Sequence, residues 1–230
     1  MQEQKSRTSS FTTLAAGPDF RHELEIKRSR FITVLRRTDS EEAARALVTD
    51  LRREFHDARH HCSAFVLGPD RSIQRSSDDG EPSGTAGIPM LEALIRRETA
   101  PGVTDLSDVS AVVVRYFGGI LLGAGGLVRA YSESVSAALD LAPLVQRRRL
   151  RLCAVRVPHA AAGRLENDLR AAGYAMAETG YEPQSTVLRL ALPDAPEPLA
   201  EAAERLAAMT SGTATLEPEG TDWVDVPLPR

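Results

Sequence analysis

A continuous apolar run, a glycine-rich loop and a long helical pattern follow one another between residues 109 and 141. The run VSAVVVRY (109–116) does not alternate with polar residues, which is typical of a central strand covered on both faces. The helical pattern begins near Leu127 and ends before Pro143, which cannot continue a helix. A strand, a glycine turn and a helix in this order predict a fold in which helices pack against a sheet.

The remaining patterns predict two α+β domains. In the first half, strands are expected over 23–35, 62–67 and 109–116, and helices over 41–55, 88–97 and 127–141. From residue 149 to 217 the order strand, helix, strand, strand, helix, strand is that of a ferredoxin-like βαββαβ domain. We therefore expect a disordered N-terminus over 1–18, a first domain over 19–145, a second over 146–220 and a tail over 221–230.

Composition limits the classes of protein to be considered. The formal net charge of −4 does not favour a generally basic nucleic-acid binder, so DNA is not expected, although it leaves room for a local basic patch. The N-terminal residues lack the apolar core of a signal peptide, and no run is long enough for a membrane helix. The two cysteines form no CxxC motif. These features predict a cytoplasmic protein with no membrane partner.

The loop between the central strand and its helix is a candidate anion site. Glycines let backbone amides approach an anion, and the start of a helix adds partial positive charge. The loop glycines considered for this role are Gly118, Gly119, Gly123, Gly125 and Gly126. Neither familiar phosphate motif is complete, because Ala124 replaces the P-loop lysine and Val128 the third dinucleotide-motif glycine. A tight turn and close helix–sheet packing explain the same glycines without a ligand.

Three side chains beside this loop suit a nucleotide or nucleic acid. Arg115, Tyr116 and Phe117 combine a cation with two aromatic rings, which can contact a phosphate and stack on a base. Alternation along the strand places the two rings on opposite faces, so at least one is expected in the core. Arg129, one turn into the helix, is expected to point back toward the same site.

A second loop, DDGEPSGTAG (78–87), contains three carboxylates and also precedes a helix. Ser83 or Thr85 can cap that helix, with Gly84 in the turn between them. Asp78, Asp79 and Glu81 have several possible roles: turn and cap stabilisation, a bridge to Arg115 or Arg129, Mg²⁺ binding opposite a phosphate, or catalysis. We expect the two glycine loops to lie side by side, and the catalytic residues, if any, stay unknown.

Two further clusters of side chains carry groups that can bind ligands. His56, His60, His61 and Cys62 include soft ligands, but zinc sites usually draw on two separated pairs, so no metal site is assigned and His60 is interpreted as a polar site residue. Arg147, Arg149 and Arg151 would share one strand face and could meet RNA phosphate, although a solvated face explains them as well.

These motifs resemble the YigZ/IMPACT family. The resemblance rests on DDGEPSGTAGIPML with VVVRYFGGILLGAGGLVRAYS, and on EIKRSRFI (25–32) and ARHHC (58–62). It covers about residues 20–142, and the βαββαβ remainder resembles the extra C-terminal domain of the bacterial branch.

The resemblance implies a fold and a function. It implies a left-handed βαβ N-terminal domain, similar to a ribosomal protein, elongation factor G domain IV and GHMP kinases, and a C-terminal domain similar to the adjacent elongation factor G domain. It favours a non-enzymatic translation-associated regulator without a cofactor that binds the ribosome, RNA or a translation factor. The alternative is a phosphate- or nucleotide-handling enzyme that uses the glycine loops and Mg²⁺.

Overall fold

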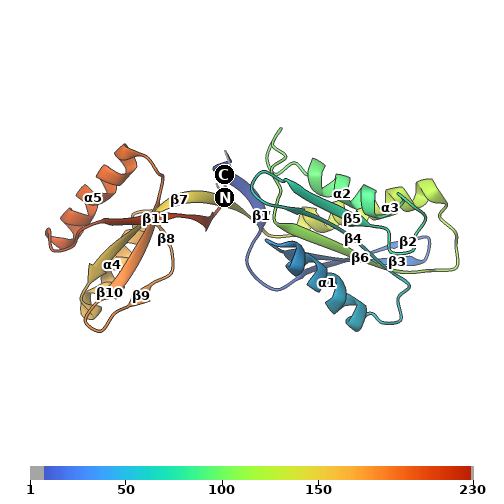
Figure 1. The fold of residues 1–230 in the computed structure, drawn as a ribbon, viewed down its shortest axis with the longest axis horizontal. Helices are drawn as coiled ribbons and strands as arrows, with labels where there is room; N and C mark the ends of the chain where they lie inside the picture. Colours follow the sequence, from blue (N-terminus) through green and yellow to red (C-terminus); the bar gives the residue numbers. More distant parts are fainter. Residues whose placement is uncertain (1–7, 229–230) are drawn as a thin grey trace, which may run out of the picture. The chain divides into compact units, whose positions relative to one another are not determined.

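The computed structural model describes residues 8–228, which form a mixed α and β structure with two sheets and five helices. The chain divides into two compact units (Figure 1), one ending at Gln146 and taking in the residues after Val226, the other spanning Arg147–Val226. This division falls one residue from the boundary expected from the sequence. Within the described part of the chain, no helix has the length and apolar character needed to cross a membrane.

The first unit is built on a five-stranded antiparallel sheet in the order β2-β3-β6-β4-β5. Its strands are β2 (Phe20–Ile26), β3 (Ser29–Arg37), β4 (His60–Leu67), β5 (Ile73–Ser77) and β6 (Val109–Tyr116). The central position of β6 agrees with its uninterrupted apolar run. The strand expected over 23–35 is a hairpin instead, because Lys27 and Arg28 adopt positive φ and turn the chain back.

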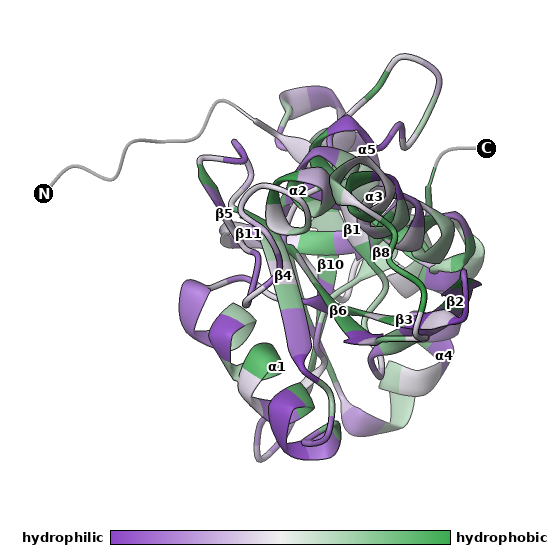
Figure 2. Ribbon diagram, turned by 90° about the vertical axis from the view of Figure 1, so that its right-hand side faces the viewer, coloured by the Kyte–Doolittle hydropathy of each residue, from purple (hydrophilic) through white to green (hydrophobic). Residues whose placement is uncertain are grey.

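Helices cover both faces of this sheet. Figure 1 shows α1 (Glu41–Glu54) on one side and α2 (Gly87–Arg96) and α3 (Ala124–Leu141) on the other. Val112 of β6 is buried in a cluster with Leu47 of α1, whereas its neighbour Val113 belongs to the larger core under α2 and α3. Figure 2 shows hydrophobic and hydrophilic stretches alternating along α1, as expected of a helix with one buried face.

The N-terminal segment contains a strand where disorder was expected. Strand β1 (Ser10–Leu14) pairs with β7 (Leu144–Val157), and Phe11 and Leu14 are only 2% and 4% exposed. Phe and β-branched Thr favour strands, and the buried Thr13 hydroxyl donates to the Asp108 carbonyl. The disorder prediction was therefore wrong for residues 10–14, and residues 1–7 lie outside the described part of the chain.

The strands of the second unit belong to the six-stranded sheet that β1 joins through β7. In it β10 lies between β7 and β8, while β11 pairs with β7 and β9 with β10. The unit's further elements are α4 (His159–Ala171), β8 (Ala175–Met176), β9 (Gly180–Tyr181), β10 (Thr186–Leu192), α5 (Pro196–Thr210) and β11 (Glu217–Val226). The strand expected over 175–181 is divided into β8 and β9. Because β11 continues to Val226, the expected tail was wrong for residues 221–226.

Candidate functional site

The two glycine loops meet at the end of β6. Arg115, near the end of that strand, donates from Nη1 to Glu81 Oε1 at 2.6 Å, and the two side chains are only 7% and 4% exposed. Glu81 comes from the loop that precedes α2. This is the carboxylate–arginine pair that the sequence predicted, and it joins the 78–87 loop to the start of the 115–126 loop.

Two buried side chains extend this pair. The Tyr131 hydroxyl donates to Glu81 Oε1 at 2.7 Å, and the single S–H of Cys62 has two acceptors within reach, the Tyr131 hydroxyl at 3.3 Å and the Asp78 carbonyl at 3.0 Å. Burial raises the pKa of Tyr131, and it raises the pKa of Cys62 to about 12. Both groups stay protonated at neutral pH, so they act as hydrogen-bond donors and Cys62 is not an activated nucleophile.

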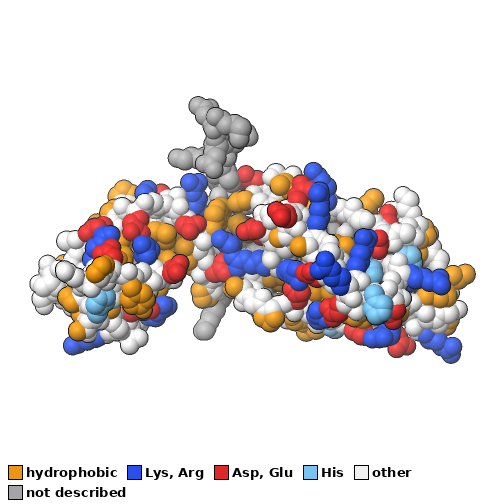
Figure 3. Space-filling model, turned by 60° about the horizontal axis from the view of Figure 1, so that its bottom comes forward, with side chains coloured by type: hydrophobic (Ala, Val, Ile, Leu, Met, Phe, Trp, Pro, Cys, Tyr) orange, Lys and Arg blue, Asp and Glu red, His pale blue; other side chains and the backbone are white. Residues whose placement is uncertain are grey.

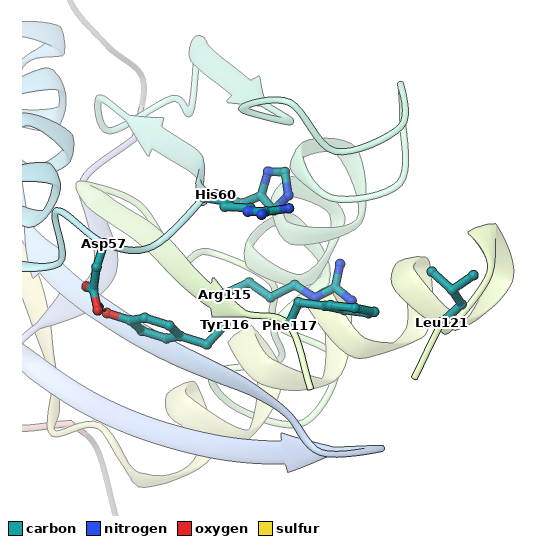
Figure 4. Close-up of a pocket in the computed structure, with 7 residues that line it drawn as sticks. Asp57, His60, Arg115, Tyr116, Phe117 and Leu121 are labelled. Atoms are coloured by element: carbon teal, nitrogen blue, oxygen red, sulfur yellow. Dashed lines mark hydrogen bonds between the residues drawn. The ribbon is translucent and has the colours of Figure 1, made fainter. Parts of the chain in front are cut away.

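The Arg115 guanidinium lies between two aromatic rings. Its Cζ atom is 5.4 Å from the centroid of Phe31 and 5.8 Å from that of Phe117. Figure 4 shows the Arg115 side chain along Phe117, with His60 on its other side. Arg115 Nη2 reaches Ser29 Oγ at 3.5 Å, whereas the buried Nε makes no hydrogen bond to any described residue.

Asp78 caps helix α2. Its carboxylate accepts hydrogen bonds from the backbone N–H groups of Gly84, Ala86 and Gly87 at 2.8, 3.0 and 2.8 Å. Burial alone would raise the pKa of Asp78, but these three donors outweigh it and hold the pKa below its ordinary value.

The expected caps of α2 were wrong. Ser83 is exposed, and the Thr85 hydroxyl donates to the Pro82 carbonyl instead of capping the helix. Because Asp78 occupies the amides of the Gly84–Gly87 turn, the expectation that this turn also binds an anion is not supported by its geometry.

Asp79 faces away from Asp78 and Glu81. It accepts from Arg52 Nη2 at 2.5 Å and from the His61 backbone N–H at 2.6 Å, and its own carbonyl meets His60 Nδ1 at 2.9 Å. The three carboxylates of the loop therefore have three different sets of partners. In residues 8–228 no group of three or more His, Cys, Asp or Glu side chains is arranged to hold a metal ion.

The glycines of the 115–126 loop have different roles. A Cβ on Gly118 would lie 2.0 Å from the Arg28 carbonyl group, so only glycine lets the loop pack against the β2–β3 turn. The Gly118 amide is already bound, since it donates to Ser29 Oγ at 3.2 Å. Gly119 and Gly123 adopt positive φ, and Gly123 begins α3 without a side-chain cap. These positions agree with the turn-and-packing interpretation of the loop.

Two glycines and Arg129 lie further along the loop and helix. Gly125 has open space around it, and a Cβ on Gly126 would meet the Leu122 side chain at 3.0 Å. Arg129 lines a separate shallow groove with Gly125, Ser132 and Glu133. The expectation that Arg129 points back to Arg115 was therefore wrong, because the helical phase turns Tyr131 inward and leaves Arg129 exposed.

A pocket of about 480 Å³ opens at the end of β6. Asp57 and Arg59 line it from the α1–β4 connection and His60 from the start of β4. The other lining residues come from β6 and the loop after it: Arg115, Tyr116, Phe117 and Leu121. Figure 4 shows Asp57 and Leu121 at opposite ends, with Arg115 and Phe117 between them. The Tyr116 hydroxyl donates to Asp57 Oδ1 at 2.7 Å, and this bond lowers the pKa of Asp57.

The pocket lining and the β2–β3 turn at Lys27 and Arg28, which packs against Gly118, combine apolar and basic side chains and are together called the pocket rim. Phe117 is 53% exposed and Leu121 83%. Lys27, Arg28 and Arg59 are exposed and make no ion pair or side-chain hydrogen bond with any residue in 8–228. By contrast, the face of this unit that bears α1 carries basic and acidic side chains side by side (Figure 3), many of them in ion pairs. The pocket rim therefore brings three unpaired basic side chains together, whereas Arg53 on α1 and Arg129 on α3 are also exposed without an ion pair among residues 8–228 but lie apart from it.

The sequence pattern did not identify several residues of this site. Tyr131 and Ser29 support the Glu81–Arg115 pair, Arg52 holds Asp79, and Asp57 and Leu121 line the pocket. The sequence spacing could have identified Tyr131 as a buried residue, because it follows Leu127 by four residues on the same face of α3. Ser29 and Arg52 carried no such signal, since their contacts depend on how the hairpin and α1 pack.

Comparison with known proteins places this site within a family. The Impact N-terminal domain family matches residues 27–139, which include both glycine loops. The IMPACT family member YvyE of Bacillus subtilis (strain 168) is 43% identical over 173 residues, which cover 75% of this chain and 75% of YvyE. The chain belongs to the IMPACT family.

Other IMPACT relatives agree with this assignment. The family member YigZ of Escherichia coli (strain K12) is 56% identical over 117 residues, covering 50% of this chain and 54% of YigZ. A crystal structure of a hypothetical protein matches with a TM-score of 0.56 and 39% identity, covering 91% of this chain and 97% of that one.

Proposed function

We propose that this IMPACT protein is a non-enzymatic, cytoplasmic regulator of translation that binds RNA of the translation machinery through the pocket rim. The proposal rests on one observation about the charged side chains around the 78–87 loop: the acidic ones have partners inside the protein and the exposed basic ones of the pocket rim do not. Its carboxylates face partners within the protein, whereas the exposed side chains of Lys27, Arg28 and Arg59 meet no carboxylate among residues 8–228. An otherwise acidic chain thus offers a local surface on which a phosphate backbone can bind.

The apolar side chains of the rim favour RNA over a free anion. Exposed aromatic rings beside basic side chains suit unpaired bases, which stack on the rings while the backbone meets the cations. Phe117 and Leu121 extend from the loop next to the basic β2–β3 turn, because Gly118 packs directly on Arg28. The resemblance of the two units to adjacent domains of elongation factor G is part of this proposal and favours a ribosomal RNA target.

The enzymatic alternative has weaker support. A phosphate-transfer site would need carboxylates that converge on one Mg²⁺ ion. Asp78, Asp79 and Glu81 instead bind a helix start, Arg52 and Arg115.

The experiment that tests the proposal is affinity purification of the tagged full chain from cells, with and without ribonuclease, followed by RNA sequencing. We expect ribosomal RNA in the untreated eluate and its loss after nuclease. The double variant Lys27→Asn/Arg28→Asn removes two rim charges while Asn tolerates the positive φ of the turn. It should recover several-fold less RNA than the wild type.

The matched control is Arg45→Gln/Arg96→Gln, which removes two exposed arginines at the other end of the unit. It should recover as much RNA as the wild type. Equal losses in both double variants, or wild-type protein that recovers no RNA, would contradict the proposal. Magnesium-dependent nucleotide turnover by the purified wild-type protein would favour the enzyme.

A further inference from the structure

The pocket at the end of β6 has the size and the groups of a site for one nucleotide. Its volume of about 480 Å³ lies within the range of small-ligand sites. Its walls carry an aromatic ring, Phe117, an exposed cation, Arg59, and an imidazole, His60. Resting on the proposed RNA-binding function, we infer that this pocket receives a single unpaired ribonucleotide of the bound RNA, with the base against Phe117 and the phosphate at Arg59.

Arg115 gives the pocket wall a fixed guanidinium group. The residue is 7% exposed and lines the pocket, yet its Nε–H has no hydrogen-bond acceptor among the described residues. A buried donor without a partner is costly, and the Nε atoms of Arg71 and Arg97 are left in the same state, so an ordered water or a ligand oxygen would serve as the acceptor at Arg115. The Glu81 carboxylate holds the guanidinium at Nη1, so Arg115 is fixed before the ligand arrives.

His60 offers a ligand a hydrogen-bond acceptor, because its other ring nitrogen is engaged as a donor. Its Nδ1 lies 2.9 Å from the Asp79 carbonyl oxygen, which can only accept, so Nδ1 carries the proton. The neutral ring therefore has Nε2 as its acceptor. A ribose hydroxyl or a base amino group can donate to this atom, as RNA recognition requires.

The charge of the pocket favours a nucleotide within a chain over a free nucleoside monophosphate. Glu81 neutralises Arg115, which leaves Arg59 as the uncompensated cation of the lining and Asp57 as its carboxylate. A phosphodiester carries one negative charge and a free monophosphate nearly two. The single exposed guanidinium matches the former, and Asp57 would repel the latter.

The test uses the full chain and a fluorescein-labelled single-stranded oligoribonucleotide that contains one 2-aminopurine. Stacking of that base in the pocket should change its fluorescence, and an RNA duplex of the same sequence should bind at least tenfold more weakly by anisotropy. Phe117→Ala should weaken single-strand binding about 10- to 100-fold and abolish the 2-aminopurine response. Phe117→Leu, which keeps an apolar side chain without the ring, should also lose the response.

Matched variants separate the pocket from the general surface. Val128→Ala, at an exposed apolar position on α3 outside the pocket lining, should bind like the wild type. Arg59→Gln should weaken RNA binding several-fold. It should also reduce the slope of log affinity against log salt concentration by the contribution of about one phosphate contact, whereas Arg96→Gln should change neither.

The outcomes distinguish this inference from the function on which it rests. If RNA binds and Lys27→Asn/Arg28→Asn weakens it, but Phe117→Leu and Phe117→Ala behave like Val128→Ala, the pocket is not a nucleotide site and RNA binding stands. If duplex and single strand bind equally, the single-nucleotide inference is also wrong. If the wild type binds no RNA at all, both proposals fail.

Discussion

Glu81 and Arg115 form a buried ion pair with a 2.6 Å contact between residues 34 positions apart in the chain. The pair is enclosed by the Phe31 and Phe117 rings and by the Tyr131 hydroxyl. It joins the acidic loop before α2 to the end of β6. The acidic residues of that loop therefore support the surface from within, which explains why carboxylates occur beside a site proposed to bind an anion.

Neutralising Glu81 should strongly destabilise the first unit. Glu81→Gln leaves the Arg115 charge buried without its counter-ion, and breaking a buried pair costs about 3–5 kcal/mol. Urea unfolding should show this loss in the free energy of unfolding. Glu98→Gln, at an exposed carboxylate, should change it by less than about 0.5 kcal/mol. Equal effects of the two substitutions would mean that the pair contributes no stability.

Removing the Asp78 carboxylate should destabilise α2 in a pH-dependent way. Asp78→Ala loses three hydrogen bonds to backbone N–H groups, which predicts a cost of about 2–3 kcal/mol at pH 7. The folded-state pKa of Asp78 is lowered, so its contribution is present above the unfolded value of about 3.9 and is lost as pH falls through the folded pKa. Urea titrations of both proteins between pH 7 and pH 3 should show the difference shrinking below about pH 4. If the difference in unfolding free energy between the two proteins does not change with pH, the ionised carboxylate of Asp78 is not the group that caps α2.

The two kinds of glycine in the 115–126 loop should respond differently to alanine. Gly118→Ala would place a Cβ 2.0 Å from the Arg28 carbonyl group, which should cost at least about 2 kcal/mol. Gly125→Ala meets open space in the first turn of α3 and should stabilise the protein by up to about 1 kcal/mol. Thermal unfolding of the two variants measures both. A destabilised Gly125→Ala protein would contradict the packing interpretation and point to a backbone requirement at that position.

Local patterns predicted the centre of the first unit well. The uninterrupted apolar run of β6 and the stop at Pro143 depend only on near neighbours in sequence, and α3 indeed ends at Leu141. The Glu81–Arg115 pair could also be predicted, because a carboxylate-rich loop needs a cation and strand ends bring loops together. The residues that determine β6, the end of α3 and the ion pair can therefore be recognised from the sequence alone.

The incorrect expectations concern features that depend on tertiary packing. Strand β1 is buried because its residues meet partners far along the chain, at β7 and at residues 105–108. The choice of Asp78 over Ser83 as the α2 cap depends on the path of the loop, which no spacing rule specifies. Arg129 could have been placed correctly, since Leu127, Ala130 and Tyr131 already define the buried face of α3.

The Cys62 thiol should be chemically silent in the folded protein. It is fully buried, donates to Tyr131, and has a pKa raised to about 12 by burial, so almost no thiolate exists at pH 8. In a Cys153→Ser background, Cys62 should react with a thiol reagent at pH 8 at least a hundredfold more slowly in buffer than in denaturing urea. Glu81→Gln, which weakens the network around Tyr131, should raise the rate in buffer without changing it in urea. A fast reaction of the folded wild-type site would show that the thiol is accessible, and the assignment of Cys62 as a purely structural donor would then be wrong.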